Sequence, residues 1–181
     1  MKKVLFVITL FIVATVNVNA QDWIDYKSED LAFIAKFPAE PTRTVQDVES
    51  EIGMLKMYML NYTPPADEGD ENQLYGVIRT DYPKSHFEDA DEAYNNNVLD
   101  GAIEGAVSNI KGKLVFDNKI KLNGFPGRSV KIDIEIGSIY MKTFLIENKM
   151  FITQVICLTD KDNNDSINRF LNSFDILKVK E

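Results

Sequence analysis

Alternation of apolar and polar residues dominates the second half of the chain and predicts β-strands. In residues 129–136, valine or isoleucine occupies every second position, so this strand has one apolar and one solvated face. Residues 151–158 place apolar side chains on both faces, which predicts a central strand. The turns between neighbouring runs are short, and short turns predict an antiparallel meander over 114–122, 129–136, 139–146 and 151–159.

The first half of the chain predicts four further strands. Pro38 ends the first of them, because proline cannot belong to a central ladder. Gly53 lies close to the turn of a hairpin formed by the next two. A proline-rich, acidic stretch without apolar periodicity then predicts an exposed loop before the fourth. The four strands are expected at 31–37, 42–48, 54–62 and 74–81.

Two helices complete the pattern. Ser85 and Glu88 have the spacing of a capping box, which predicts that a long helix begins at Ser85 and ends near Gly112. Its apolar stripe faces a sheet, and Gly101 and Gly105, one turn apart, would allow a close approach. A second helix is expected at residues 163–174, and its core-facing residues are Ile167, Phe170, Leu171 and Phe174.

The expected architecture is of the α+β class: a single twisted antiparallel β-sheet flanked by a helix on each face. At about 100–200 residues per domain, residues 21–181 are long enough for one globular domain. We therefore expect one domain that follows a short leader.

The leader is residues 1–20. Lys2 and Lys3 precede an apolar run over 4–16, and the small-residue sequence Val18-Asn19-Ala20 follows. This order is typical of a cleavable secretory signal peptide. The apolar run is shorter than the roughly 20 residues of a spanning helix, and no cysteine follows it for lipid attachment. We expect a periplasmic or secreted protein without stable membrane insertion after cleavage.

Charge narrows the choice of partners. The formal net charge is -8, and the leader carries two lysines and no acid, so residues 21–181 carry -10. Nucleic acid is disfavoured as a partner, because phosphate binding needs a basic surface. One basic interval stands out, and it is either a solvated strand face or a strip that docks an acidic protein. Its residues are Lys111, Lys113, Lys119 and Lys121.

Three short motifs resemble those of the PsbP-like family. They are Phe37-Pro38-Ala39-Glu40-Pro41, Gly124-Phe125-Pro126-Gly127-Arg128 and Arg169-Phe170-Leu171-Asn172-Ser173-Phe174. The resemblance implies an α/β/α sandwich and a place among small exported bacterial proteins of uncharacterised function. The family also includes the extrinsic photosystem II subunit and a Ran-binding nuclear-transport factor. The motifs are structural, so the resemblance assigns no functional residue.

Catalytic side chains are scarce. His86 is the only histidine and thus the only imidazole base for a Ser or Cys nucleophile, and no G-x-S-x-G motif occurs. We interpret His86 as a solvated residue in the first turn of a helix. Cys157, the single cysteine, lies in an apolar strand and is expected to pack as a small hydrophobe. We expect no catalytic residue and no cofactor.

Metal binding is not expected either. One histidine and one cysteine cannot complete a structural zinc site. Residues 160–165 imitate the opening of a calcium loop, but Asp165 replaces its glycine and Leu171 replaces its closing glutamate. We interpret this stretch as a connection that caps the last helix. The acidic loop at 67–71 is expected to be solvated and to attract cations only weakly.

These observations favour an exported, non-catalytic binding or accessory protein that docks a protein of the cell envelope. Two alternatives stay open. One is a hydrolase that uses two carboxylates brought together by the fold. The other is a carrier of a small apolar ligand, whose wall residues would be Met57, Met59, Tyr62 and Tyr94.

Overall fold

A computed structural model describes residues 23–50, 52–67 and 69–177, which build two antiparallel sheets and two α-helices. The predicted leader, residues 1–20, lies outside the described residues. The large sheet has the strand order β3-β4-β5-β9-β8-β7-β6. Its strands are β3 (Thr42–Ser50), β4 (Gly53–Tyr62), β5 (Asn72–Asp81), β6 (Lys113–Leu122), β7 (Phe125–Ile134), β8 (Gly137–Ile146) and β9 (Lys149–Leu158).

A second, three-stranded sheet was not predicted. It has the order β1-β2-β10 and consists of β1 (Ile24–Ser28), β2 (Phe33–Phe37) and β10 (Asp175–Ile176). The expectation of a single sheet was therefore wrong, although the α+β class is confirmed. Residues 24–28 do alternate in burial, but the stretch is too short for its period to stand out from a polar segment.

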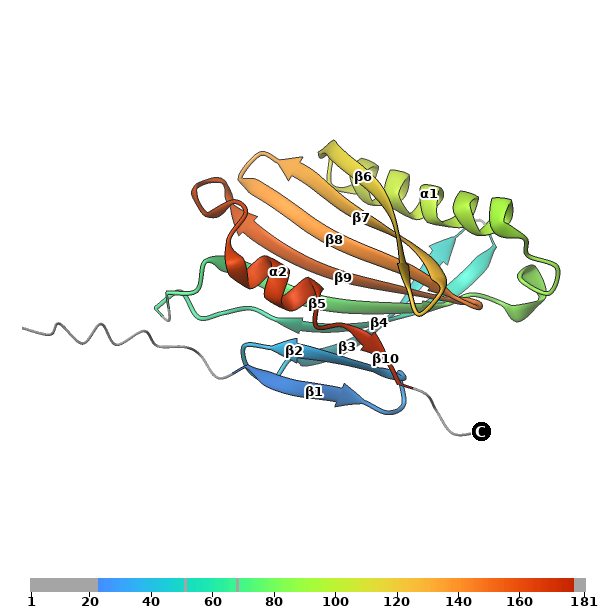
Figure 1. Cartoon of the computed structure of the whole chain (residues 1–181), viewed down its shortest axis with the longest axis horizontal. Coiled ribbons are helices and arrows are strands. Elements are labelled where there is room, and N and C mark those ends of the chain that lie inside the picture. The colour runs from blue at the N-terminus through green and yellow to red at the C-terminus, as the bar shows by residue number, and fades with distance from the viewer. Residues whose placement is uncertain (1–22, 51, 68, 178–181) are drawn as a thin grey trace, which may run out of the picture.

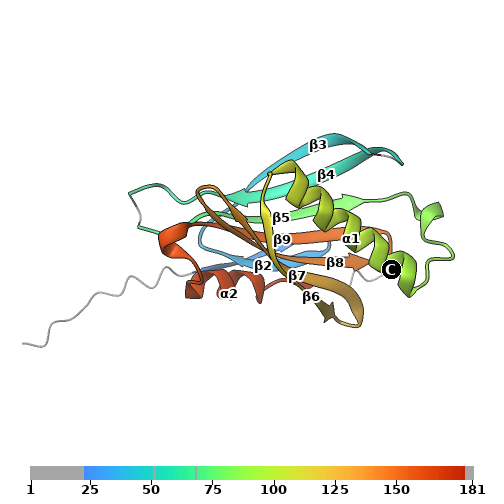
Figure 2. The ribbon, with the colours of Figure 1, turned by 90° about the horizontal axis from the view of Figure 1, so that it is seen from above.

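The helices lie on opposite faces of the large sheet (Figure 1). α1 (Glu92–Asn109) packs on β7 and β8, whereas α2 (Asp165–Leu171) and the small sheet cover the other face. Figure 2 shows α1 running obliquely across the large sheet, with β3 at the margin of that sheet. Two 3₁₀ turns, η1 (Lys84–His86) and η2 (Thr159–Lys161), precede the helices. In the described part of the chain, no helix is long and apolar enough to cross a membrane.

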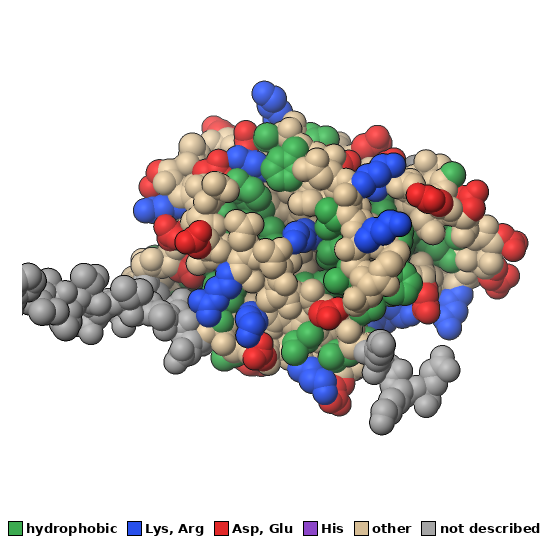
Figure 3. All heavy atoms as spheres, in the orientation of Figure 1, with side chains coloured by type: hydrophobic (Ala, Val, Ile, Leu, Met, Phe, Trp, Pro, Cys, Tyr) green, Lys and Arg blue, Asp and Glu red, His purple; other side chains and the backbone are tan. Residues whose placement is uncertain are grey.

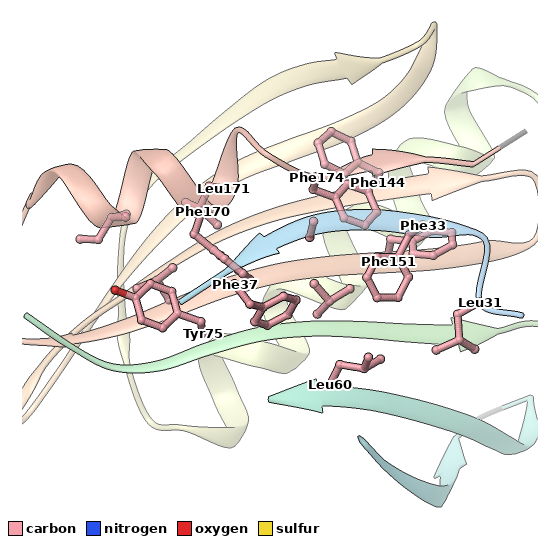
Figure 4. Close-up of a cluster of buried hydrophobic side chains, with 14 of the residues drawn as sticks. Leu31, Phe33, Phe37, Leu60, Tyr75, Phe144, Phe151, Phe170, Leu171 and Phe174 are labelled. Carbon is pink, nitrogen blue, oxygen red and sulfur yellow. The ribbon is translucent and has the colours of Figure 1, made fainter. Parts of the chain in front are cut away.

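The main core lies between the two sheets and beneath α2. Its aromatic rings meet edge to face or stacked, as between Phe37 and Phe170 and between Phe144 and Phe174 (Figure 4). Such pairs add about 0.5–1.5 kcal/mol beyond the burial of their area. β9 runs between β5 and β8, which confirms its predicted central position.

A smaller core lies beneath α1. Ile103 packs on Val130 and Ile132 of β7, and Leu99 packs on Leu145 and Met150. The apolar stripe of the helix thus covers one half of the sheet, as its spacing predicted. The glycines do not face that sheet: a Cβ atom added at Gly101 or Gly105 would meet nothing within 4 Å. The expectation that they allow close packing was wrong.

The start of α1 also differs from the prediction. The helix begins at Glu92, and the Asp91 side chain accepts a hydrogen bond from the Tyr94 N–H at 2.8 Å. Ser85 lies in η1 and caps nothing. Phe87 packs against the core beneath α1, so the chain turns here before the helix begins. Asp91 is an equally good cap, and the sequence pattern could not choose between the two.

α2 is shorter than predicted. It begins at Asp165, and the Asn164 side chain accepts a hydrogen bond from the Ile167 N–H at 3.1 Å. This contact confirms that the acidic, asparagine-rich connection caps the last helix. Phe174 lies beyond the helix but still reaches the main core.

Candidate functional site

Exposed apolar side chains in the described residues fall into two groups. Single exposed hydrophobic residues are normal on protein surfaces, whereas contiguous ones mark interaction sites. One group comes from the β3–β4 hairpin and the start of α1: Val45, Ile52, Met54 and Tyr94. The other comes from the end of α1, the start of β6 and the neighbouring turns: Ile110, Leu114, Val115, Ile136 and Leu158.

Two of the predicted docking lysines lie next to members of the second group in the sequence. Ile110, Leu114 and Val115 are 40–48% exposed, and Lys111 and Lys113 are interleaved with them along the chain. We call these five residues the α1–β6 patch. Lys113 and Leu114 are consecutive in β6 and point to opposite faces of the sheet, so the α1–β6 patch wraps around the end of this edge strand.

The backbone of the α1–β6 patch is tightly held. α1 ends when the Gly112 N–H bonds to the Val107 carbonyl at 3.0 Å, and Lys111 adopts a left-handed conformation with φ of +51°. Glycine usually occupies that position of a helix end. A Cβ atom at Gly112 would lie only 2.4 Å from Ile132 Cγ2, so glycine is needed there. The conformation of this connection is therefore sterically restricted, and it holds Lys111 in the left-handed region.

A β-bulge separates the four predicted docking lysines. Lys113 pairs with Asp133, whereas Lys119 pairs with Arg128 across the same two strands. The register shifts between Leu114 and Phe116, so the alternation of faces reverses at that point. Lys113 consequently lies on the face opposite to that of Lys119 and Lys121. Lys113 and Lys121 are also about 26 Å apart along the strand, at 3.3 Å per residue.

The structure thus places Lys111 and Lys113 in the α1–β6 patch and leaves Lys119 and Lys121 near the β6–β7 turn. β6 is an outer strand of the large sheet. Lysines on such an edge also hinder unwanted strand pairing. The docking role of the four lysines stays a prediction, and the surroundings of the first pair favour it more than those of the second.

Arg128 fixes α1 above β6 and β7. It is almost fully buried, and its Nη2 donates a hydrogen bond to Asp100 Oδ1 at 2.5 Å. Its Nη1 donates to Asn96 Oδ1 at 3.1 Å, and Asp117 lies 3.5 Å from its Nε. A buried guanidinium with two carboxylates and an amide is well compensated. The Gly124-to-Arg128 motif is therefore structural, as the sequence indicated.

The arrangement of layers matches a solved structure. The chain is similar to cyanobacterial PsbP (CyanoP) from Synechocystis sp. PCC 6803, with a TM-score of 0.57 and 11% sequence identity. The match covers 88% of this chain and 95% of that one. This chain has the PsbP-like fold. No protein-family model matches it, and neither does any curated protein sequence.

In this PsbP-like fold, one of the four residues proposed for an apolar ligand, Tyr62, lies on the opposite face of β4 from Met57 and Met59. Tyr62 packs in the main core, where its ring stacks on Tyr75. Met57 and Met59 lie on the same face as Leu55, because alternate residues of a strand share a face. Tyr94 lines an open groove between α1 and the β3–β4 hairpin, of about 700 Å³, together with Ile52, Leu55, Val98, Gly101 and Gly105.

The carboxylates of the PsbP-like fold are placed at its surface. Glu88 and Glu147 line one hollow of about 380 Å³, but both are exposed and Glu147 pairs with Lys149 at 3.3 Å. Throughout residues 23–50, 52–67 and 69–177, no Asp or Glu is buried. A catalytic general acid of the glycosidase type depends on an apolar surrounding. Among the described residues, none is a buried carboxylate of the kind that the hydrolase alternative requires.

The surroundings of His86, Cys157 and Asp162 suit structural roles. His86 is exposed in η1, and Cys157 is buried, where burial raises the pKa of its thiol. Asp162, in the calcium-like stretch, accepts hydrogen bonds from Lys131 Nζ at 2.6 Å and Tyr140 Oη at 2.7 Å. Within the described ranges, no group of three or more His, Cys, Asp or Glu side chains is arranged to hold a metal ion.

On the face shown in Figure 3, acidic and basic side chains are interspersed, and hydrophobic atoms lie between them. No broad field of one sign covers this face. Any electrostatic selectivity of this face would therefore be local.

Proposed function

We propose that the protein is an exported, non-catalytic accessory protein of the cell envelope that docks an acidic protein partner through the α1–β6 patch. One observation carries the proposal: exposed Ile110, Leu114 and Val115 flank Lys111 and Lys113 at the connection between α1 and β6. Covering these exposed apolar side chains removes their area from water, which favours binding.

Charge supports the choice of partner. Residues 21–181 carry a net charge of -10, so an acidic protein is repelled by most of this molecule. Lys111 and Lys113 provide a local exception beside apolar side chains. An acidic partner that carries an apolar segment is thereby directed to this patch and away from the rest of the surface.

Export rests on the first twenty residues, whose order of charge, apolar run and small residues is that of a cleavable signal peptide. The domain boundary proposed here is therefore 1–20 for the leader and 21–181 for the working protein. Mass spectrometry of the protein from its native host tests this boundary. A chain that begins at Gln21 supports export, and a cytoplasmic chain that retains Met1 contradicts it.

The two alternatives have weaker support. A hydrolase needs two converging carboxylates, whereas none of the described carboxylates is buried and several pair with lysine or arginine. A carrier of the kind outlined from sequence would enclose its ligand, whereas the groove beside α1 is open to solvent.

A photo-crosslinking residue at position 115 tests docking in the native host. Val115 lies in the α1–β6 patch, and Asn118, three residues further along the same edge strand, is an exposed control. We expect one acidic envelope protein to be crosslinked from position 115 and not from position 118. Equal crosslinking from both positions, or none from position 115, contradicts the proposed site.

A further inference from the structure

The other outer strand of the large sheet, β3, is also largely exposed. It pairs with β4 alone, and its residues are exposed at seven of nine positions. Figure 2 shows β3 at the margin of the sheet. Val45 at its centre is 49% exposed. A long, regular edge strand is a template for another strand.

The two outer strands differ in their charges. β6 carries Lys113, Lys119 and Lys121 and a single acid, Asp117. Two copies of β6 would therefore bring several like charges together. β3 carries both signs: Arg43 precedes the central Val45 by two residues, Asp47 follows it by two, and Glu49 lies nearer the end of the strand.

These three residues share one face of β3, because alternate side chains of a strand point the same way. Arg43 is already held on that face: its Nη1 lies 2.7 Å from Asp30 Oδ2, and its guanidinium lies over the Tyr58 ring at 5.4 Å. Asp47 is only loosely engaged, with its Oδ1 3.9 Å from Lys56 Nζ. Arg43 is thus held in a fixed position on this face, and the Asp47 carboxylate is available for another cation.

We propose that β3 pairs antiparallel with β3 of a second copy of this chain, around a two-fold axis at Val45. In that register Arg43 of each copy lies opposite Asp47 of the other, and the two Val45 side chains meet. Cross-strand pairs of opposite charge and of β-branched residues both stabilise antiparallel sheets. The interface is self-complementary, as a two-fold axis requires.

Other arrangements of the same strands are less favourable. A register centred on Gln46 places Asp47 opposite Val45, which brings a charge against an apolar side chain. A parallel, in-register pairing places Arg43 beside Arg43 and Asp47 beside Asp47. Of these three arrangements, the antiparallel register centred on Val45 alone forms both Arg43–Asp47 pairs and the contact between the two Val45 side chains.

Such pairing would join two large sheets into one continuous sheet. Each β6 edge, with its α1–β6 patch, would stay at an outer end. The dimer would therefore present two copies of the patch and could bind a repeated partner with increased avidity. The proposal does not depend on the docking function, because it concerns the opposite edge of the sheet.

A cysteine at position 45 tests the register directly. Directly opposed residues of antiparallel strands have Cα atoms about 4.5–5.5 Å apart, which suits a disulfide. The native Cys157 is buried and will not compete. We expect mild oxidation of Val45→Cys protein to give a covalent dimer that disappears on reduction.

Gln46→Cys is the matched control, since it is exposed on the same strand. In the proposed register the two Gln46 residues are two positions out of step, and their Cα atoms are farther apart than the ~7 Å limit for a disulfide. We expect little dimer from this variant. Equal dimer from both variants, or more from Gln46→Cys, contradicts the proposed register.

Sedimentation of the protein across a concentration series tests the pairs of opposite charge. We expect a monomer–dimer equilibrium that Asp47→Arg shifts to monomer, and that Arg43→Asp combined with Asp47→Arg restores. Circular dichroism checks that each variant is folded. A wild-type monomer at every concentration, or failure of a folded double variant to recover the dimer, overturns the proposal and favours β3 as a guarded edge or as a site for another protein.

Discussion

Arg128 Nη2 and Asp100 Oδ1 join β7 to α1 across the second core of the molecule. The arginine side chain is 4% exposed and the aspartate side chain is 48% exposed. Water can therefore replace a lost partner at the aspartate but not at the arginine. This contact and the hydrogen bond to Asn96 help to position α1, together with the packing of Leu99 and Ile103 on the sheet.

Arg128→Ala should be strongly destabilising. It leaves Asp117 and Asp100 without their common cation and opens space beneath α1. Breaking a buried ion pair costs about 3–5 kcal/mol. We expect Asp100→Asn to cost much less, because its exposed carboxylate is hydrated. Urea unfolding of both variants measures this difference, and equal losses would contradict the role assigned to Arg128.

Asp91 should be the cap of α1 that matters for stability. Its carboxylate accepts a hydrogen bond from the Tyr94 N–H, so Asp91→Ala is expected to lower the free energy of unfolding by about 0.5–2 kcal/mol. Ser85→Ala is the control, since Ser85 lies outside α1 and makes no cap. Thermal melts of the two variants in parallel would show the reverse order if the sequence-based capping box were the real start of the helix.

The left-handed backbone conformation of Lys111 should lower the stability of the fold. A non-glycine residue in the left-handed region costs about 1–2 kcal/mol, so Lys111→Gly is expected to stabilise the fold by up to that amount. Lys111→Ala removes the same charge but keeps the strain. We predict that Lys111→Gly unfolds at a higher urea concentration than Lys111→Ala, and that both variants bind the partner more weakly. A glycine variant no more stable than the alanine variant would show that the strain is absent.

Asp162 should make stability depend on pH in the acid range. Hydrogen bonds from Lys131 and Tyr140 hold the pKa of Asp162 below its usual range in the folded state. A lowered folded pKa gives stability that is present above the unfolded value of about 4 and is lost as the pH falls through the folded pKa. The unfolding free energies of wild type and Asp162→Asn should therefore converge in acid. A gap that stays constant between neutral and acid pH would contradict this assignment.

The parts predicted from sequence are those with a strong local period. The central strand β9 and the stripe of α1 repeat apolar residues often enough to be recognised, and the burial of Cys157 follows from its strand. β1 was missed because five residues carry too little periodicity. The predicted start of α1 lies several residues before the observed one, because Ser85 and Asp91 both suit a helix N-terminus. The tertiary packing of Phe87 decides between them.

The candidate site was predicted only in part. Lys111 and Lys113 were identified, but the bulge after Leu114 was not visible in the sequence, and it separates them from Lys119 and Lys121. The exposed apolar neighbours were missed as well, because exposure depends on where the sheet ends. A strand edge is a property of the whole topology and leaves little signal in its own residues.

Charge reversal at the two lysine pairs tests the central claim most directly. The crosslinking yield from position 115 should be compared between Lys111→Glu with Lys113→Glu and the matched pair Lys119→Glu with Lys121→Glu. Both double variants change the net charge equally, so any general effect of charge is the same. We predict that the first abolishes crosslinking and the second leaves most of it. Equal loss in both, or loss only in the second, would contradict docking at the α1–β6 patch.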